Sequence, residues 1–419
     1  MKINKKLTSN IYTISVLKKF NVILFGIFST ALLNRYLGPT NKGEYAYILS
    51  IANILVVLLN FGINLTYPSF KRRQDKNYLP IFQALSIFEF VFLLFISAIS
   101  FLLTNDPAIF LIILLTAIGV FRMQLNYFNL VENIHSHSYI TIIAAFFNFI
   151  FILVIYMLPE SNLLFAYIVY ILKDSIIIVL SFKSIKRKLV WKDFDFKMWK
   201  EIITYGLVPM YTTLLISINY KIDVILLETL NINLLLIGLY TVGVSLAEYG
   251  WLVPDIFKDV MINRTAVKDD IDNMTFSLRI SSTTMIFVYI GIVTFGEKMI
   301  LILFGNEFID AYSVTVIIFL GIYSMIYTKI IGTLYIAKGQ WKFYAIVLSL
   351  SVISNIFFNL LMIPIWGING AAYSSIISYS IAGLAFLLDF KREYSLNLLD
   401  LIVINKDDLK KITSVLSKK

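Results

Sequence analysis

Long apolar runs separated by short polar turns repeat along the whole chain. The stretch from Ile202 to Val260 shows the pattern clearly, since two apolar segments there are joined by the tight connection Asn231-Ile232-Asn233. A helix needs about 20 apolar residues to cross a bilayer, and both segments are long enough. Similar runs before and after this pair predict an all-α polytopic membrane protein with about twelve transmembrane helices.

Polar turns, several of which contain Pro or Gly, set the expected ends of the spans. In the first half the spans are expected to end near residues 37, 68, 103, 131, 159 and 182. In the second half, the two segments of Ile202 to Val260 are followed by spans that end near residues 295, 337, 370 and 389. The connection 296–312 contains another short apolar run, and we expect it to lie in the outer membrane interface.

The two halves of the chain carry a similar short motif. Gly43-Glu-Tyr45 and Gly238-Leu-Tyr240 each follow a polar connection and open an apolar segment. Because many transporters are built from two repeats, we expect one six-helix bundle in residues 1–182 and a second in residues 201–390. A cytoplasmic basic loop, 183–200, would join them, and a cytoplasmic basic tail would occupy 391–419. Aromatic residues such as Trp199 alternate with the charges of that loop, which is typical of a segment in the membrane interface.

The charge distribution indicates orientation rather than a nucleic-acid partner. The chain of 419 residues has 36 Lys and Arg residues and a formal net charge of +10, but only 15% of its residues are charged. Most of the basic residues fall in alternate short loops instead of one patch. By the positive-inside rule this pattern places both termini in the cytoplasm.

Motifs for metal, disulfide or nucleotide chemistry are missing from the sequence. Cysteine is absent, which excludes disulfides and thiolate metal sites. Gly38 to Gly43 has the spacing of a phosphate-binding loop, but Glu44-Tyr45 follows where Lys and Ser or Thr are required. The only histidines, His135 and His137, have no third ligand in view. We therefore expect no metal, no cofactor and no nucleic acid.

Several charged residues lie inside the expected spans, where they need a polar environment. An ionised side chain at the bilayer centre costs roughly 2.5–3.5 kcal/mol, so such residues face a protein interior or a water-filled cavity. Four cations are candidates for substrate binding: Arg122, Lys173, Lys221 and Lys329. Three carboxylates are candidates for ion coupling: Asp223, Glu248 and Glu89. Structural ion pairs for the cations and neutral structural roles for the acids stay open as alternatives, and Arg279 could extend to the inner surface.

Asn side chains also recur inside the expected spans, at spacings that place them on one face of a helix. The candidate cavity amides are Asn53, Asn60 and Asn64 in the second span, Asn126 in the fourth, and Asn355 and Asn359 in the eleventh. Hydrogen bonds between helices, worth about 0.6 kcal/mol each, would explain the amides alone. Because Arg122 lies on the same stripe as Asn126, a hydrated cavity explains that stripe better.

Three residues are candidate hinges in the two spans of the stretch Ile202 to Val260. Pro209 and Pro254 each remove one hydrogen bond inside an expected helix. Gly206 lies about one turn before Pro209, so we expect the first of these spans to bend there.

Further stretches resemble a known family. They are Arg35-Tyr-Leu-Gly-Pro39, Leu303-Phe-Gly305-Asn-Glu-Phe308 and the run from Asn359 to Ala372. In this order they are similar to the polysaccharide-unit flippases of the multidrug/oligosaccharidyl-lipid/polysaccharide exporter superfamily. The resemblance runs through nearly the whole chain.

This resemblance implies a fold and a function. The fold would be two six-helix bundles around a central cationic cavity in the bacterial inner membrane. Alternating access would move undecaprenyl-pyrophosphate-linked oligosaccharide repeat units, for O antigen or capsule, to the outer leaflet. Arg122, Lys173, Lys221 and Lys329 would bind the pyrophosphate, and a proton or Na⁺ would drive the cycle. Besides membrane lipid, a polymerase and a chain-length protein would be partners.

Two other functions stay open. A small-molecule or drug antiporter of the same superfamily would have the same number of spans. An integral membrane glycan polymerase is the alternative from another class, but such enzymes usually need a sizeable outer loop, and the outer loops here are short. We therefore expect a transporter and not an enzyme.

Overall fold

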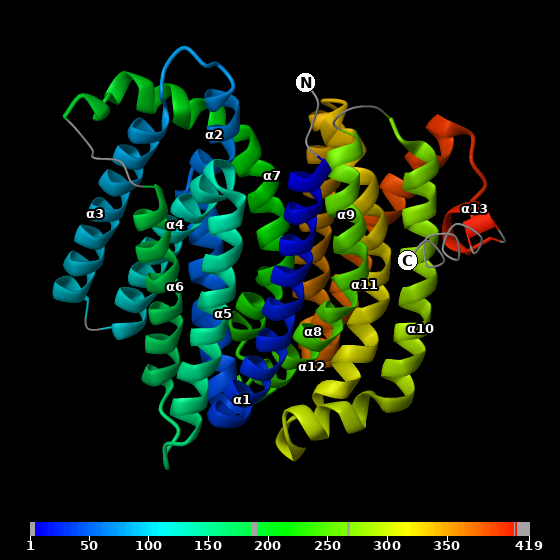
Figure 1. Ribbon diagram of the computed structural model, residues 1–419. Helices are drawn as coiled ribbons and strands as arrows, with labels where there is room; N and C mark the ends of the chain where they lie inside the picture. Colours follow the sequence, from blue (N-terminus) through cyan, green and yellow to red (C-terminus); the bar gives the residue numbers. More distant parts are fainter. Residues whose placement is uncertain (1–4, 105, 186–190, 266–268, 406, 409–419) are drawn as a thin grey trace. The chain divides into compact units, whose positions relative to one another are not determined.

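Helices build the chain throughout this computed structural model, which describes residues 5–104, 106–185, 191–265, 269–405 and 407–408 (Figure 1). No strand occurs within those ranges, so the predicted all-α fold is confirmed. The chain divides into two compact units, Met1–Ser217 and Ile218–Lys419. The division lies inside α7 (Phe196–Thr229), whereas the sequence predicts a boundary in the loop 183–200.

The first unit begins with a helix that is too long for a single crossing. α1 (Lys5–Leu59) contains Gly38, whose φ of 66° and ψ of 171° lie outside the helical region. Glycine adopts a positive φ at little cost, and Pro39 beside it has no amide hydrogen to donate. α1 therefore consists of two consecutive spans, as the sequence predicts. The remaining helices are α2 (Ile63–Lys71), α3 (Leu79–Leu103), α4 (Pro107–Glu132), α5 (Ile134–Tyr156) and α6 (Leu163–Ile185).

The ends of α3 and α4 follow directly from their turn residues. Proline occupies the first turn of each helix, where its missing amide hydrogen is not needed. The Asp106 side chain also caps α4 by accepting a hydrogen bond from the Ala108 amide at 2.8 Å. The predicted span 79–103 matches α3, and the predicted end at 131 lies one residue before the end of α4.

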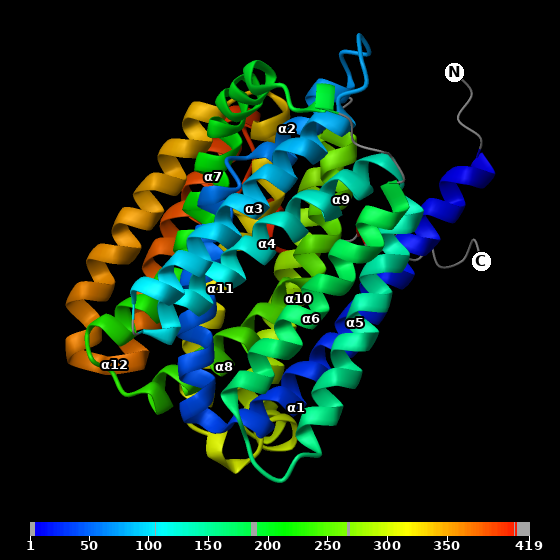
Figure 2. The ribbon, with the colours of Figure 1, turned by 90° about the vertical axis from the view of Figure 1, so that its left-hand side faces the viewer.

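α5 and α6 complete the first unit. α5 packs against α1 (Figure 2). The Phe25 ring of α1 lies 5.6 Å from that of Phe146 and 5.9 Å from that of Phe149, measured between centroids. α6 packs against both α4 and α5. These contacts place α6 beside the two helices that carry Arg122 and His137.

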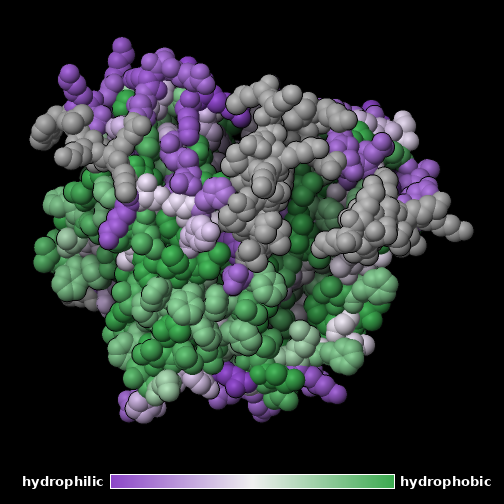
Figure 3. Space-filling model, viewed as in Figure 1, coloured by the Kyte–Doolittle hydropathy of each residue, from purple (hydrophilic) through white to green (hydrophobic). Residues whose placement is uncertain are grey.

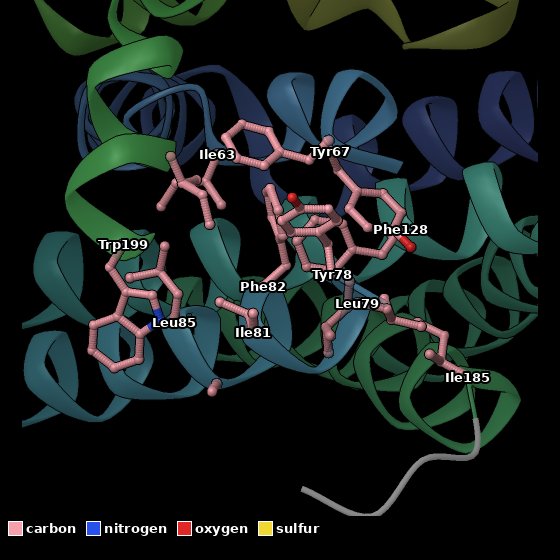
Figure 4. Close-up of a cluster of buried hydrophobic side chains, with 14 of the residues drawn as sticks. Ile63, Tyr67, Tyr78, Leu79, Ile81, Phe82, Leu85, Phe128, Ile185 and Trp199 are labelled. Atoms are coloured by element: carbon pink, nitrogen blue, oxygen red, sulfur yellow. The ribbon is translucent and has the colours of Figure 1, made fainter. Parts of the chain in front are cut away.

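An aromatic core at one end of the first unit includes the start of α7 (Figure 4). Tyr67 packs edge-to-face on Phe82 and on Phe128, with ring centroids 5.1 Å apart in both pairs. Trp199 is only 4% exposed and belongs to this core together with Ile202. Trp199 thus lies in the first turns of α7 and packs on this core, and the interfacial position of its segment stays a prediction.

The second unit contains another long helix with a glycine kink. α12 (Trp341–Tyr394) changes direction at Gly367, where φ is 54° and ψ is −131°. A short 3₁₀ turn, Tyr249–Trp251, separates α8 (Leu234–Glu248) from α9 (Leu252–Thr265). α10 (Ile271–Leu303), α11 (Ala311–Ala337) and the short α13 (Leu399–Ile402) complete this unit.

Three expectations for the second unit need correction. The apolar run after residue 296 continues α10 as far as Leu303, so it is helix rather than a connecting loop. Residues of the predicted tail also pack on the unit, because Leu401 is fully buried and α13 contacts α10. Arg279 of α10 does not extend to the surface: it is 8% exposed and pairs with Asp408, with 2.6 Å between Nε and Oδ2.

Ten helical segments of the described chain are long and apolar enough to cross a membrane. Lys18–Lys71 and Trp341–Glu393, with 54 and 53 residues, contain the kinks at Gly38 and Gly367, so each provides two crossings. Hydrophobic side chains form a broad band on the face shown in Figure 3, and hydrophilic ones gather at both ends. The protein is therefore a multi-pass membrane protein with about the predicted number of spans.

Candidate functional site

A buried carboxylate in the first unit holds two of the predicted cations. Asp174 of α6 is fully buried, and its Oδ2 lies 2.8 Å from Nε of Arg122 on α4. Its Oδ1 lies 3.3 Å from Nζ of the neighbouring Lys173. The two cationic side chains remain 25% and 27% exposed. The cluster therefore carries two positive charges and one negative charge, and both cations can reach an additional anion.

A second polar network in the first unit joins three helices. Gln124 of α4 donates hydrogen bonds to Asn60 Oδ1 at 2.9 Å and to Glu89 Oε2 of α3 at 2.7 Å. Asn60 in turn donates to Asn64 Oδ1 at 2.6 Å. The structure thus brings together Asn60, Asn64 and Glu89, which were predicted separately. Gln124 connects them, although the sequence did not single it out.

Two predicted cavity amides do not join this network. The Asn53 amide donates to the carbonyl of Leu49 on its own helix at 2.7 Å. Asn126 instead meets Nδ1 of His137 on α5 at 3.1 Å.

Asp223 of α7 is the centre of the polar network in the second unit. It is 2% exposed, and its oxygens accept hydrogen bonds from Asn359 at 2.7 Å, Tyr240 at 2.7 Å and Ser375 at 2.6 Å. The donors come from α12, α8 and the second half of α12, so the carboxylate ties three segments together. Asn355 extends the network through bonds with Asn359 and Ser378. The predicted residues Asp223, Asn355 and Asn359 therefore form one site.

The two buried acids, Asp223 and Glu89, have a shared feature. Every side-chain partner found for them in the described ranges is a neutral amide or hydroxyl, and no Lys or Arg pairs with either. A carboxylate without a counterion in a low-dielectric interior is costly when charged. Uptake of a proton or a cation would remove that cost, which is the chemistry that ion coupling requires.

Lys329 lies beside the break between α8 and α9. Its Nζ is 2.9 Å from Oδ1 of Asp255 and 3.9 Å from the centroid of the Trp251 ring. Trp251 itself donates from Nε1 to the carbonyl of Ile322 at 3.1 Å. Lys329 is therefore held by an ion pair and a cation–π contact, which the sequence did not predict because both partners lie far from it along the chain.

Among the predicted charged residues, Lys221 and Glu248 differ in their polar contacts within the described chain. Both are half-buried, and neither side chain forms a hydrogen bond or an ion pair within the described part of the second unit. Glu248 is the last residue of α8 and directly precedes the 3₁₀ turn. The two side chains therefore have charge available for a ligand.

The predicted hinge residues occupy three different local structures. Pro209 lies inside the continuous α7, and its carbonyl accepts from Thr213 Oγ1 at 2.8 Å. Pro254 lies in the first turn of α9, where a missing amide hydrogen costs little. Gly206 lies against the turn between α1 and α2, where a Cβ atom would come within 2.0 Å of the Phe61 carbonyl oxygen. Gly206 thus permits a close contact, and whether any of the three positions bends remains a prediction.

Comparison with known proteins identifies the fold. No protein-family model matches the chain. Among curated proteins it is 22% identical over 403 residues to the capsular polysaccharide biosynthesis protein CapF of Staphylococcus aureus, a match that covers 90% of this chain and 96% of CapF. The inward-facing conformation of a multidrug resistance MATE family transporter of the MOP superfamily aligns with a TM-score of 0.67 and 14% identity. That alignment covers 89% of this chain and 95% of the other.

A flippase structure aligns as well. The lipid II flippase MurJ, in an inward closed conformation, aligns with a TM-score of 0.71 and 15% identity over 97% of this chain and 93% of MurJ. The chain has the MOP-superfamily fold. The family resemblance seen in the sequence motifs is confirmed at the level of the fold. The two aligned structures are named as a multidrug resistance transporter and a lipid II flippase.

Several residues of these polar clusters were missed by sequence reasoning. Tyr240 and Ser375 bind Asp223, and Asp255 binds Lys329. Tyr240 stands in the repeated Gly-x-Tyr motif, so its repetition was a signal that could have pointed to a role. Ser375 and Asp255 carried no such signal, because isolated serines and helix-terminal acids are common in membrane helices.

Proposed function

We propose that the protein is a flippase for undecaprenyl-pyrophosphate-linked oligosaccharide repeat units in surface polysaccharide (O antigen or capsule) biosynthesis. The observation that carries the proposal is the relative named for capsular polysaccharide biosynthesis, which aligns over 90% of this chain. The MOP fold, shared with a structure named as a lipid II flippase, supports movement of a lipid-linked substrate. Transfer would run from the inner to the outer leaflet by alternating access.

The cationic residues fit the anionic part of such a substrate. A pyrophosphate presents several acceptor oxygens, and charge-assisted hydrogen bonds to Lys or Arg are about twice as strong as neutral ones. Arg122 and Lys173 keep partly exposed side chains although they share Asp174. Lys221 has no protein partner in the described part of its unit. In this proposal each of these residues, like Lys329, is a separate candidate contact for the pyrophosphate.

The buried acids fit an ion-coupled cycle. Asp223 has only neutral donors around it, so arrival of a proton or Na⁺ would change the charge of the junction between α7, α8 and α12. Glu89 has a similar environment in the first unit, and Glu248 lies at the break after α8. One charge moving through about 100 mV supplies about 2.3 kcal/mol. That free energy can shift the populations of two conformations without converting the protein fully to one of them.

The proposal places the protein in the bacterial inner membrane with both termini in the cytoplasm. The distribution of Lys and Arg among the loops supports this orientation. A polymerase and a chain-length protein would then act on the product outside. Reporter fusions after Arg72 and Arg264 should report the cytoplasm, and fusions after Asp106 and Asn233 should report the outside. A cytoplasmic signal at Asn233 would contradict the orientation.

A drug antiporter is the second candidate, because the MATE family structure is named for multidrug resistance. The two functions differ in what accumulates when the gene is deleted. Loss of the flippase should leave a lipid-linked oligosaccharide on the inner leaflet and no surface polysaccharide. Normal surface polysaccharide together with greater drug sensitivity in the deletion strain would support the antiporter and reject the flippase.

A further inference from the structure

Two neighbouring pockets lie at one end of the second unit. The first has a volume of about 420 Å³ and lies between the start of α8, the last turns of α10, the start of α11 and the kink of α12. The second has a volume of about 580 Å³ and lies between the two halves of α12, on either side of Gly367. Asn369 lines both pockets. Both volumes fall in the range of roughly 300–1,000 Å³ that is usual for ligand pockets, so the pair has room for a ligand of several rings.

The residues that line these pockets belong to none of the polar clusters described above. Trp366 and Asn369 instead fall in the run from Asn359 to Ala372 that the sequence singles out. A second such stretch, Leu303–Phe308, ends two residues before Asp310, which lines the first pocket. Two sequence motifs thus lie at a site to which the cations and acids of the spans give no role.

The first pocket offers both hydrogen-bond acceptors and a donor. Glu297 and Asp310 are exposed, and neither carboxylate forms an ion pair within the ranges that the structure describes. Asp310 directly precedes α11, yet its side chain forms no capping hydrogen bond and stays available. The Ser313 hydroxyl donates to Asn369 Oδ1 at 3.1 Å, which orients that amide and leaves its NH₂ group free to donate.

The second pocket offers two aromatic faces beside the same amide. Trp366 and Tyr373 are 53% and 40% exposed, and their ring centroids lie 5.8 Å apart with an angle of 77° between the planes. The face of an aromatic ring carries partial negative charge, so it attracts the C–H groups on the face of a sugar ring. The rings and the amide therefore present a stacking surface next to a hydrogen-bonding edge.

We propose that this pair of pockets binds the sugar rings of an oligosaccharide. One ring would stack on Trp366, and hydroxyl groups of the chain would bond with Asn369 and Asp310. Carboxylates accept from sugar hydroxyls, whereas the amide NH₂ donates to them. A pyrophosphate does not fit, because like charges on Glu297 and Asp310 would repel it. The inference rests on the proposed function for the identity of the oligosaccharide, the sugar part of the lipid-linked substrate.

The proposed orientation of the chain gives the site a place in the transport cycle. α8 begins directly after Asn233, which that orientation puts outside. Because the start of α8 lines the first pocket, the site would face the outer side of the membrane. It would therefore hold the sugar part of a repeat unit once that unit has reached the outer leaflet.

An organic cation is the competing ligand, since carboxylates and aromatic rings can both attract one. The arrangement of the groups favours the sugar. Glu297 and Asp310 line only the first pocket, whereas Trp366 and Tyr373 line only the second. A compact cation would need ring and carboxylate around the same point, but an oligosaccharide can extend through both pockets and meet each group in turn.

The test measures binding to the full-length protein in lipid nanodiscs. The probes are oligosaccharides of one to four rings, without lipid or phosphate, released by partial hydrolysis of the host's own surface polysaccharide. They should bind saturably to the wild type. Trp366→Leu should weaken binding at least tenfold, and Asn369→Ala and Asp310→Asn severalfold, whereas Trp366→Tyr should retain most of it because a ring remains.

Two matched controls should bind these oligosaccharides as the wild type does. Trp341 is 39% exposed and begins the same long helix, so Trp341→Leu removes an exposed indole away from the pockets. Asp272 is exposed in the first turn of α10, so Asp272→Asn removes an exposed carboxylate elsewhere. Equal weakening by Trp341→Leu and Trp366→Leu would overturn the proposal, because a general effect of exposed Trp at the membrane would explain both.

The remaining outcomes decide between the ligands. The proposal is overturned if no oligosaccharide binds saturably to the wild type, or if Trp366→Leu binds as well as the wild type does. Saturable binding of tetraphenylphosphonium that Asp310→Asn weakens, without any binding of sugar, would assign the pockets to organic cations instead.

The outcome is separable from the proposed function. A wild-type protein that binds oligosaccharides through Trp366 but moves no lipid-linked oligosaccharide would contradict the flippase and leave the sugar site assigned. A wild-type protein that moves the substrate while Trp366→Leu keeps full sugar affinity would contradict the sugar site alone.

Discussion

Asp223 shows how a single residue can connect the fold with transport. Three neutral donors from α8 and from both halves of α12 hold its carboxylate. We predict that Asp223→Asn slows transport and blunts its response to an imposed pH or Na⁺ gradient in proteoliposomes, because the amide takes up no proton and has no negative charge for Na⁺ to neutralise. Glu307→Gln, at an exposed position, is the control and should respond normally. A full gradient response in Asp223→Asn would mean that coupling lies elsewhere.

Lys221 offers a cleaner test of substrate binding than Arg122. Loss of Arg122 would leave the buried Asp174 with a single partner, so transport and stability would both suffer. Lys221 has no ion pair in the described part of its unit. Lys221→Met should therefore reduce transport at least tenfold while changing the free energy of unfolding by less than about 0.5 kcal/mol. Lys342→Met, an exposed control, should transport normally; equal activity of the two variants would exclude Lys221 from the site.

At the residue scale, spacing along a helix predicted which amides share a face but not what they face. Asn60 and Asn64 do interact, as their spacing suggests, and Asn355 and Asn359 do too. Asn53 shares their pattern yet bonds to its own helix. The partners Gln124, Tyr240 and Ser375 come from other helices. A single sequence does not show which residues of two helices lie opposite each other, so it could not identify them.

The crossing of α7 over the turn between α1 and α2 gives a prediction for one helix contact. A Cβ atom on Gly206 would lie 2.0 Å from the Phe61 carbonyl oxygen. We expect Gly206→Ala to destabilise the protein by about 1–3 kcal/mol, as overpacking does. Gly26→Ala is the matched control in the same unit, since its Cβ would meet nothing within 4 Å. Thermal unfolding should separate the two variants, and equal midpoints would contradict this contact.

The C-terminal segment gives a second prediction for a helix contact. Arg279 of α10 donates to both oxygens of Asp408, from Nε at 2.6 Å and Nη2 at 2.8 Å, and from Nη1 to the Asp400 carbonyl at 2.9 Å. Removing one member of a buried pair typically costs about 3–5 kcal/mol. We expect that loss for Asp408→Ala, with partial recovery in the double variant Arg279→Met/Asp408→Leu. An unchanged unfolding temperature in Asp408→Ala would show that the segment contributes no stability.

At the element scale, the sequence predicted helices well where turn residues interrupt an apolar run. Prolines and Asp106 mark the starts of α3 and α4, and both helices match the predicted spans. The prediction failed where one composition suits two structures. The run before Leu303 could be an interfacial loop or a helix. Only the tertiary contacts of each segment decide between them.

At the scale of the whole molecule, two physical patterns made the fold predictable. Apolar length sets the number of spans, and kinks at Gly38 and Gly367 turn two long helices into four of them. Motifs distributed along the chain pointed to the superfamily whose fold the structure shares. The substrate is not encoded in these patterns, because a drug antiporter and a lipid-linked sugar flippase need the same spans. Substrate identity has to be measured.

The most direct test of the account is transport by the purified protein. Proteoliposomes would contain undecaprenyl-pyrophosphate-linked oligosaccharide, and an impermeant sugar-oxidising reagent would report the fraction exposed on the outer leaflet over time. The account predicts that wild-type protein makes the inner pool accessible when a proton or Na⁺ gradient is applied, whereas Lys221→Met behaves like protein-free liposomes. An inner pool that stays protected with the wild type, under either gradient, would contradict the flippase.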